Sequence, residues 1–125
     1  DSHLVGVAEM DDQHRNLVRM VNRLNSEWRN GQSPQALLSL FDELVTATAE
    51  HFETEGRYMA QSAYPEQRQH EKEHALLVDE AMRLRKRMGE GGELLALQTI
   101  KDWLLNHIHH ADVRLAEYLV KRGVQ

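Results

Sequence analysis

The sequence predicts an all-α protein, an antiparallel up-down-up-down four-helix bundle formed by residues 1–125 as one domain. Apolar residues return every three or four positions along nearly the whole chain, which is the spacing of one face of an α-helix. Signals for β-strands are almost absent, and three short breaks that contain Gly or Pro divide the pattern into four segments. Because short connections join antiparallel neighbours, the four helices are expected to alternate in direction.

The first helix is predicted to begin at Asp11 or Asp12, because either carboxylate can accept hydrogen bonds from the amides of a first turn. Apolar residues then recur at intervals of three and four and form one inward stripe. The stripe consists of Leu17, Met20, Val21, Leu24 and Trp28. The Asn-Gly-Gln sequence at 30–32 ends this helix.

The other three helices are bounded by similar signals. Ser33 and Pro34 place a cap residue before a proline at the first helical position, and the second helix is predicted to run from there to Gln61. Pro65 is predicted to open the third helix. The glycine-rich break at 89–92 ends it, and the fourth helix follows.

Composition narrows the classes of function. The chain is 41% hydrophobic and 28% charged, as is usual for a globular domain, and its formal net charge of −5 gives no electrostatic support to nucleic-acid binding. There is no cysteine, which excludes disulfides, thiolate metal sites and thiol catalysis. The longest apolar runs are too short for a transmembrane helix and no export signal is visible, so a cytoplasmic location is expected.

Seven side chains that can bind a metal interrupt the apolar faces of these helices. They are His14, His51, Glu55, His70, His74, His107 and Asp112. A buried imidazole or carboxylate has to be paired, hydrogen-bonded or bound to a metal. In an antiparallel bundle the late part of the second helix lies beside the early part of the third, and the middle of the fourth lies level with the start of the first. The sequence therefore predicts that all seven side chains meet in one metal site.

The spacing of these residues carries further information. His51 and Glu55, and likewise His70 and His74, are four apart and share one helical face. His107 is five residues before Asp112, which separates the two side chains by about 140° on an ideal helix. They could share a site through different rotamer reach or through a local π-type bulge, which often marks a functional site. Each pair is a weak signal alone, and the joint set carries the prediction.

Three other histidines match no partner spacing. They are His3, His109 and His110. We expect these side chains to be exposed or to support the ligands from outside, and not to bind the metal themselves.

At these residues the chain resembles the hemerythrin family, in particular its bacterial members. The matching stretches are Gly6-Val7, Asp11-Asp12-Gln13-His14, His51-Phe52-Glu53-Thr54-Glu55, Met59, Tyr64-Pro65, His70-Glu-Lys-Glu-His74, and Trp103-Leu104-Leu105-Asn106-His107-Ile108 with Asp112. They span nearly the whole chain in the order of the family. The resemblance implies a non-haem di-iron centre that binds dioxygen.

The resemblance also implies a role for each residue. Three histidines would hold one iron and two would hold the other, namely His70, His74 and His107 on the first and His14 and His51 on the second. Glu55 and Asp112 would each bridge the two irons, with an oxo or hydroxo bridge derived from solvent. The iron with two imidazoles would keep an open position, where dioxygen would bind end-on.

Apolar neighbours of the ligands are candidates for the dioxygen pocket. Leu104 lies one turn before His107 and is the predicted pocket wall. Phe52, Trp103 and Ile108 would help to exclude water from the irons. For Phe52, Trp103 and Ile108, ordinary core packing is at least an equal alternative.

Reversible dioxygen binding is the leading expectation, which makes the chain a binding protein and not an enzyme. The role would be that of an oxygen carrier or store, or of an oxygen or redox sensor fused to a signalling output domain; the start at Asp1 suits a domain excised from a larger protein. Two other classes stay open. One is a di-iron peroxidase, oxidase or nitric-oxide-handling enzyme, and the other is iron or zinc storage.

Overall fold

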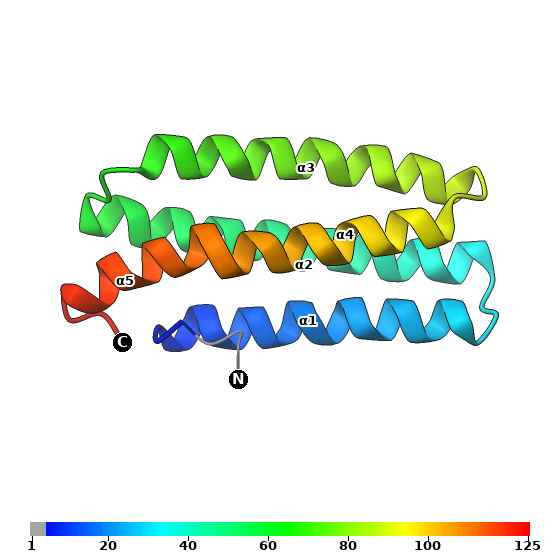
Figure 1. The fold of residues 1–125 in the computed structure, drawn as a ribbon, viewed down its shortest axis with the longest axis horizontal. Helices are drawn as coiled ribbons and strands as arrows, with labels where there is room; N and C mark the ends of the chain where they lie inside the picture. Colours follow the sequence, from blue (N-terminus) through cyan, green and yellow to red (C-terminus); the bar gives the residue numbers. More distant parts are fainter. Residues whose placement is uncertain (1–4) are drawn as a thin grey trace.

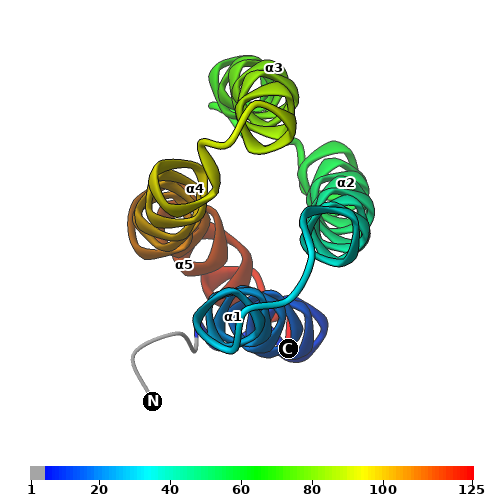
Figure 2. The same cartoon turned by 90° about the vertical axis from the view of Figure 1, so that its right-hand side faces the viewer.

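The computed structural model describes residues 5–125, which form one bundle of four helical rods (Figure 1). The elements are α1 (Ala8–Arg29), α2 (Pro34–Ser62), α3 (Gln67–Gly89), α4 (Glu93–His107), η1 (Ile108–Asp112) and α5 (Val113–Lys121). Successive rods alternate in direction, and the end-on view shows them around a common axis (Figure 2). The all-α, up-down-up-down prediction is confirmed, and no strand occurs among residues 5–125. His3 lies outside the described residues.

The start of α1 differs from the prediction. The helix begins at Ala8, three residues before Asp11, and its N-terminus has no side-chain cap. The Asp11 carboxylate instead accepts hydrogen bonds from the backbone N–H groups of Val5 (2.6 Å) and Gly6 (3.2 Å). It therefore fastens the residues that lead into the helix, a role that the capping argument for Asp11 or Asp12 did not anticipate.

The start of α2 follows the prediction. The Ser33 hydroxyl oxygen accepts a hydrogen bond from the Ala36 N–H at 3.2 Å, and Pro34 occupies the first helical position. The helix ends at Ser62, one residue beyond the predicted end.

The third helix starts later than predicted. Ala63 adopts the left-handed backbone conformation (φ 53°), and the N–H of Tyr64 donates to the Met59 carbonyl at 3.0 Å, which closes α2. Pro65 belongs to the turn that follows, and α3 begins only at Gln67. The prediction that Pro65 opens the helix was wrong because the chain needs this turn to reverse direction.

The fourth rod contains the structural device that aligns His107 with Asp112. An α-helix gives way to one turn of π-helix over η1 and resumes as α5. Hydrogen bonds from i to i+5 accommodate one extra residue per turn, so residues five apart can face the same side. The π-type bulge, one of the two explanations for this spacing, is therefore confirmed.

The core has three levels along the bundle axis. A large apolar cluster is formed by buried residues within 17–24, 37–44, 81–88 and 96–108, and a small apolar cluster by buried residues within 7–10, 59–64 and 115–119. The seven predicted metal ligands lie between these clusters on every rod. None of the helices described is both long and apolar enough to span a membrane.

Candidate metal centre

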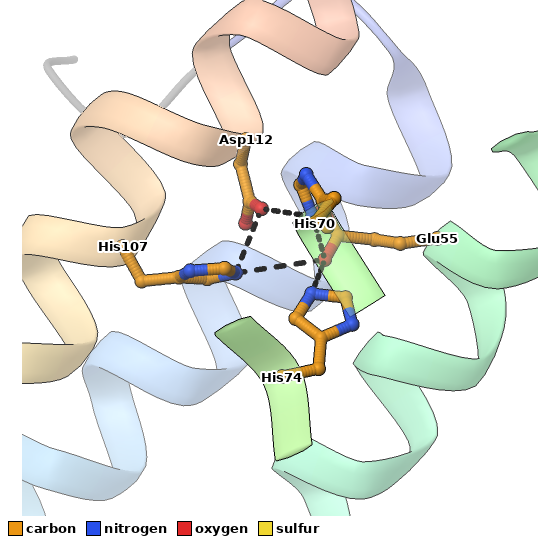
Figure 3. Close-up of side chains that lie close together, drawn as sticks. All are labelled: Glu55, His70, His74, His107 and Asp112. Carbon is orange, nitrogen blue, oxygen red and sulfur yellow. Dashed lines mark hydrogen bonds and ion pairs between the residues drawn. The ribbon is translucent and has the colours of Figure 1, made fainter. Parts of the chain in front are cut away.

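The structure brings all seven predicted ligands together in the core. Every one of them is buried, and the five imidazoles all turn Nε2 toward the two carboxylates. They form two groups that share Asp112, and the candidate ligand atoms within each group lie within 4.8 Å of one another. One group is Glu55, His70, His74, His107 and Asp112 (Figure 3), and the other is His14, His51 and Asp112.

Asp112 faces both groups with different oxygen atoms. Its Oδ2 lies 2.8 Å from His14 Nε2 and 3.0 Å from His51 Nε2. Its Oδ1 lies 3.0 Å from His107 Nε2 and 3.5 Å from His70 Nε2. One carboxylate thus presents an oxygen to each set of imidazoles.

Glu55 lies mainly on the side of the larger group. Its Oε1 is 2.9 Å from His74 Nε2, 3.3 Å from His70 Nε2 and 3.7 Å from His107 Nε2. The same oxygen lies 3.6 Å from His51 Nε2 in the smaller group. The second oxygen, Oε2, is buried without a hydrogen-bond partner.

Three other buried atoms of the cluster have a close charged neighbour but no hydrogen bond of good geometry. They are His74 Nε2, His107 Nε2 and Asp112 Oδ1. A buried polar atom without a partner costs about 1–3 kcal/mol, so such atoms rarely gather at one point without a ligand. Imidazole nitrogens together with carboxylate oxygens suit iron and other first-row transition metals. The residues present therefore fit a metal centre.

The electrostatics of the metal-free cluster lead to the same conclusion. Burial alone would lower the pKa of His107, but Asp112 and Glu55 outweigh it and raise the pKa to about 11. Burial would likewise lower the pKa of His70, but Asp112 and Glu55 outweigh it and raise the pKa to about 9. Burial would raise the pKa of Asp112, yet its hydrogen bonds to Glu55 and to the histidines hold it well below its usual range. The carboxylates thus require positive charge, which protons or metal ions can supply.

Two imidazoles are held from outside by side chains to which the sequence analysis assigned no role. His51 Nδ1 lies 2.7 Å from Gln13 Oε1, and Gln13 Nε2 donates to the Thr54 hydroxyl at 2.8 Å. His107 Nδ1 lies 2.9 Å from Glu73 Oε1. The only signal in the sequence was that Gln13 and Glu73 each stand directly before a predicted ligand.

Aromatic and apolar side chains surround the cluster. The Phe52 ring stacks on His74 with centroids 3.8 Å apart and 7° between the planes, and it meets His107 edge-on at 5.4 Å. Leu104 is 1% exposed and packs in the large apolar cluster together with Ile108. Its role as the wall of a dioxygen pocket stays a prediction.

The remaining histidines of the described region lie apart from the cluster. His109 and His110 are exposed on η1 and belong to neither group of potential ligands. The expectation that they are exposed is confirmed, and that they do not bind the metal stays a prediction.

Comparison with known proteins identifies the family. Residues 5–119 match the hemerythrin HHE cation binding domain. The chain is 34% identical over 111 residues to the bacteriohemerythrin of Pseudomonas aeruginosa (strain LESB58), covering 86% of the chain and 71% of that protein. It is 32% identical over 113 residues to a hemerythrin-like protein of Naegleria gruberi, covering 90% of the chain and 85% of that protein. Fold, site and sequence agree, and the chain belongs to the hemerythrin family, which implies a di-iron domain of the oxygen-binding type.

Proposed function

We propose that this domain binds dioxygen reversibly at a pair of non-haem iron ions joined by an oxo or hydroxo bridge. It acts as an oxygen carrier or store, or as the oxygen or redox sensor of a protein with a fused output domain, and not as an enzyme. When bound, the iron pair supplies the electrons that make reversible dioxygen binding possible. Everything else required at the site comes from the side chains of the chain.

The two-sided position of Asp112 is the observation that carries this proposal. Its Oδ1 and Oδ2 atoms face different sets of imidazoles, which supports a carboxylate shared between two metal ions. In this assignment three histidines hold one iron and two hold the other, and Asp112 and Glu55 bind both. The three are His70, His74 and His107, and the two are His14 and His51. The contact of 3.6 Å between Glu55 Oε1 and His51 supports a reach of Glu55 toward the second iron.

The unequal number of imidazoles determines where a gas molecule would bind. The side of His14 and His51 has one imidazole fewer, so the open position for dioxygen is assigned there. Leu104 and Ile108 are both buried, and in this proposal they would limit the access of water to the bound gas. Exclusion of water favours release of the gas unchanged over its loss as superoxide or peroxide.

The donor set favours binding over oxidation of a substrate. Di-iron bundles rich in carboxylates draw their ligands from glutamates and Glu-x-x-His pairs. Here Glu71 stands three residues before His74, but it is exposed and accepts a hydrogen bond from Gln67. Five imidazoles and two carboxylates remain, a set that is poor in carboxylate.

The test is to load the metal-free protein with ferrous iron under anaerobic conditions, count the bound iron and record the optical spectrum through cycles of oxygen and argon. Two irons per chain and a charge-transfer band that appears with oxygen and disappears under argon would support the proposal. Sustained turnover of peroxide would favour the enzyme, and a colourless metalloprotein would favour storage. Uptake of no paired metal would overturn the proposal.

A further inference from the structure

Two equivalent positions outside the cluster carry different chemical groups. Gln13 stands one residue before His14 on α1 but its side chain bonds to His51 on α2. Glu73 stands one residue before His74 on α3 but its side chain bonds to His107 on α4. In each half of the bundle, the residue before one predicted ligand therefore bonds to a predicted ligand on the next helix. The difference is that one acceptor is a neutral amide and the other a carboxylate.

The direction of the hydrogen bonds at Gln13 follows from its neighbours. The single hydroxyl proton of Thr54 is donated to the carbonyl of Glu50 at 3.1 Å, so the hydroxyl oxygen must accept from Gln13 Nε2. Gln13 Oε1 therefore faces His51 and accepts the Nδ1–H of that imidazole. The neutral ring then has its proton on Nδ1, which leaves the Nε2 lone pair directed at the cluster.

Glu73 fixes His107 in the same way and adds a charge. Its Oε1 lies 2.9 Å from His107 Nδ1, and the side chain is 35% exposed, so one end stays in contact with water. An ionised acceptor forms a stronger hydrogen bond than an amide does, and it makes the imidazole a stronger donor to a metal. The imidazole of His107 thus receives electron density that the imidazole of His51 does not.

We propose that Glu73, acting through His107, lowers the reduction potential of an iron bound on that side, while Gln13 adds no negative charge through His51. Glu73 and Gln13 are positioning residues that act through the imidazoles of His107 and His51, and only Glu73 does so with a negative charge. This inference rests on the proposed di-iron function. Its consequence is that an iron held by His107 would be oxidised more readily with Glu73 in place than with a neutral residue at this position.

The first test is a redox titration of the iron-loaded protein and of variants that change only the outer acceptor. Glu73→Gln keeps an oxygen acceptor but removes the charge, so the midpoint potentials should shift upward. Gln13→Glu adds a charge, so they should shift downward. Glu71→Gln removes the same charge from the exposed face of α3, and Gln61→Glu adds one on the exposed end of α2; neither control should shift the midpoints.

A second measurement separates orientation from charge. Binding of Co²⁺, which requires no redox change, should weaken about 10–100-fold in Glu73→Leu, the usual effect of losing an outer partner of a metal-binding histidine. Glu73→Gln should retain most of that affinity because its amide oxygen still orients His107. Equal losses of affinity in both variants would overturn the distinction between orientation and charge.

The outcomes of these experiments are distinguishable. If the unmodified protein binds no paired metal, the proposed function fails. If it binds two metal ions but Glu73→Gln and Gln13→Glu leave the midpoints unchanged, this inference fails and the proposed function stands. If Glu71→Gln shifts the midpoints as far as Glu73→Gln does, general surface charge is responsible and the role of the hydrogen bond is overturned.

Discussion

Each imidazole of the cluster uses its two nitrogens differently. The Nε2 atom always faces the carboxylates at the centre, and for His51 and His107 the Nδ1 atom is bonded to an outer side chain. The outer hydrogen bonds fix the orientation of these two rings, and each Nε2 atom can bind a metal once any proton on it has left. At the scale of the residue, an outer side chain fixes the direction in which each of these two imidazoles presents its Nε2 atom.

Substitution of His74 tests the ligand assignment. His74→Leu removes the Nε2 atom that lies 2.9 Å from Glu55 Oε1 but keeps an apolar side chain against Phe52. We expect the iron retained per chain to fall, because the larger group loses one of its three imidazoles. Metal analysis after desalting measures this, with His110→Leu as a control at an exposed position. Unchanged iron content in His74→Leu would contradict the assignment.

Substitution of Leu104 tests the pocket wall. Leu104→Ala should destabilise the protein by about 2–5 kcal/mol and, because water gains access, should increase the rate of auto-oxidation without loss of iron. Stopped-flow spectroscopy follows the rate. Leu84→Ala is the control, since Leu84 is fully buried in the same large apolar cluster but ten residues from His74. Equal rates in the two variants would show that Leu104 is only a core residue.

The helices show which features can be predicted from sequence. Ser33 caps α2 through a hydrogen bond within four residues and Pro34 has the φ that a first helical position requires, so the start of α2 followed directly from residue types. Asp11 is a plausible cap by composition, but its oxygen atoms bind the backbone of Val5 and Gly6, and that choice depends on the path of residues outside the helix.

The cluster of candidate ligands was predictable to a similar extent. The spacing of the seven predicted ligands in an antiparallel bundle was sufficient to predict that these side chains meet. The five-residue spacing of His107 and Asp112 allowed two solutions, because side-chain rotamers and a π turn can both align them, and only the backbone decides. Gln13 and Glu73 escaped prediction because each serves a histidine on another helix, and that contact depends on how the rods pack.

Helix α2 contains one residue that weakens it. Gly56 lies within the helix directly after Glu55, and a Cβ atom there would meet only Glu71 Oε1, at an ordinary 3.7 Å. Gly56→Ala should therefore raise the free energy of unfolding by about 1 kcal/mol, because alanine loses less backbone entropy in a helix. Denaturant titration measures this. Gly31→Ala should have the opposite sign, since φ there is +78°; a loss of stability in Gly56→Ala would contradict the argument.

In the whole molecule, the buried imidazoles and carboxylates of the candidate metal centre lie between the large and the small apolar clusters. Such an interior costs free energy unless the charges are balanced, so the stability of the bundle and the occupancy of its centre are linked. Protons can balance the carboxylates in the metal-free protein, and metal ions would replace them. The stability of the metal-free protein should then depend on pH in a way that the stability of the metal-loaded protein does not.

The metal-free protein should lose stability as the pH rises. The pKa values of His70 and His107, about 9 and about 11, lie above the ordinary value of 6.5, so the folded state holds these protons more tightly than the unfolded state. The resulting stabilisation is complete below about pH 6.5 and is lost as the pH rises through both values. Denaturant titrations between about pH 7 and about pH 10 should show the decline, and the iron-loaded protein should lack it. A metal-free protein with constant or rising stability would disprove this.

A hydrogen bond of 3.0 Å from the Ala8 N–H to the Gln125 carbonyl completes a closed path of contacts through the candidate metal centre. From Ala8 this path follows α1 to His14, crosses to Asp112 on η1, and returns along α5 to Gln125. Figure 1 shows the start of α1 and the end of α5 at the same end of the bundle. A displacement of Asp112 would therefore be transmitted to the end of the bundle where α1 begins and α5 ends. The opposite end, which holds Gly31 and Gly91, lies outside this path.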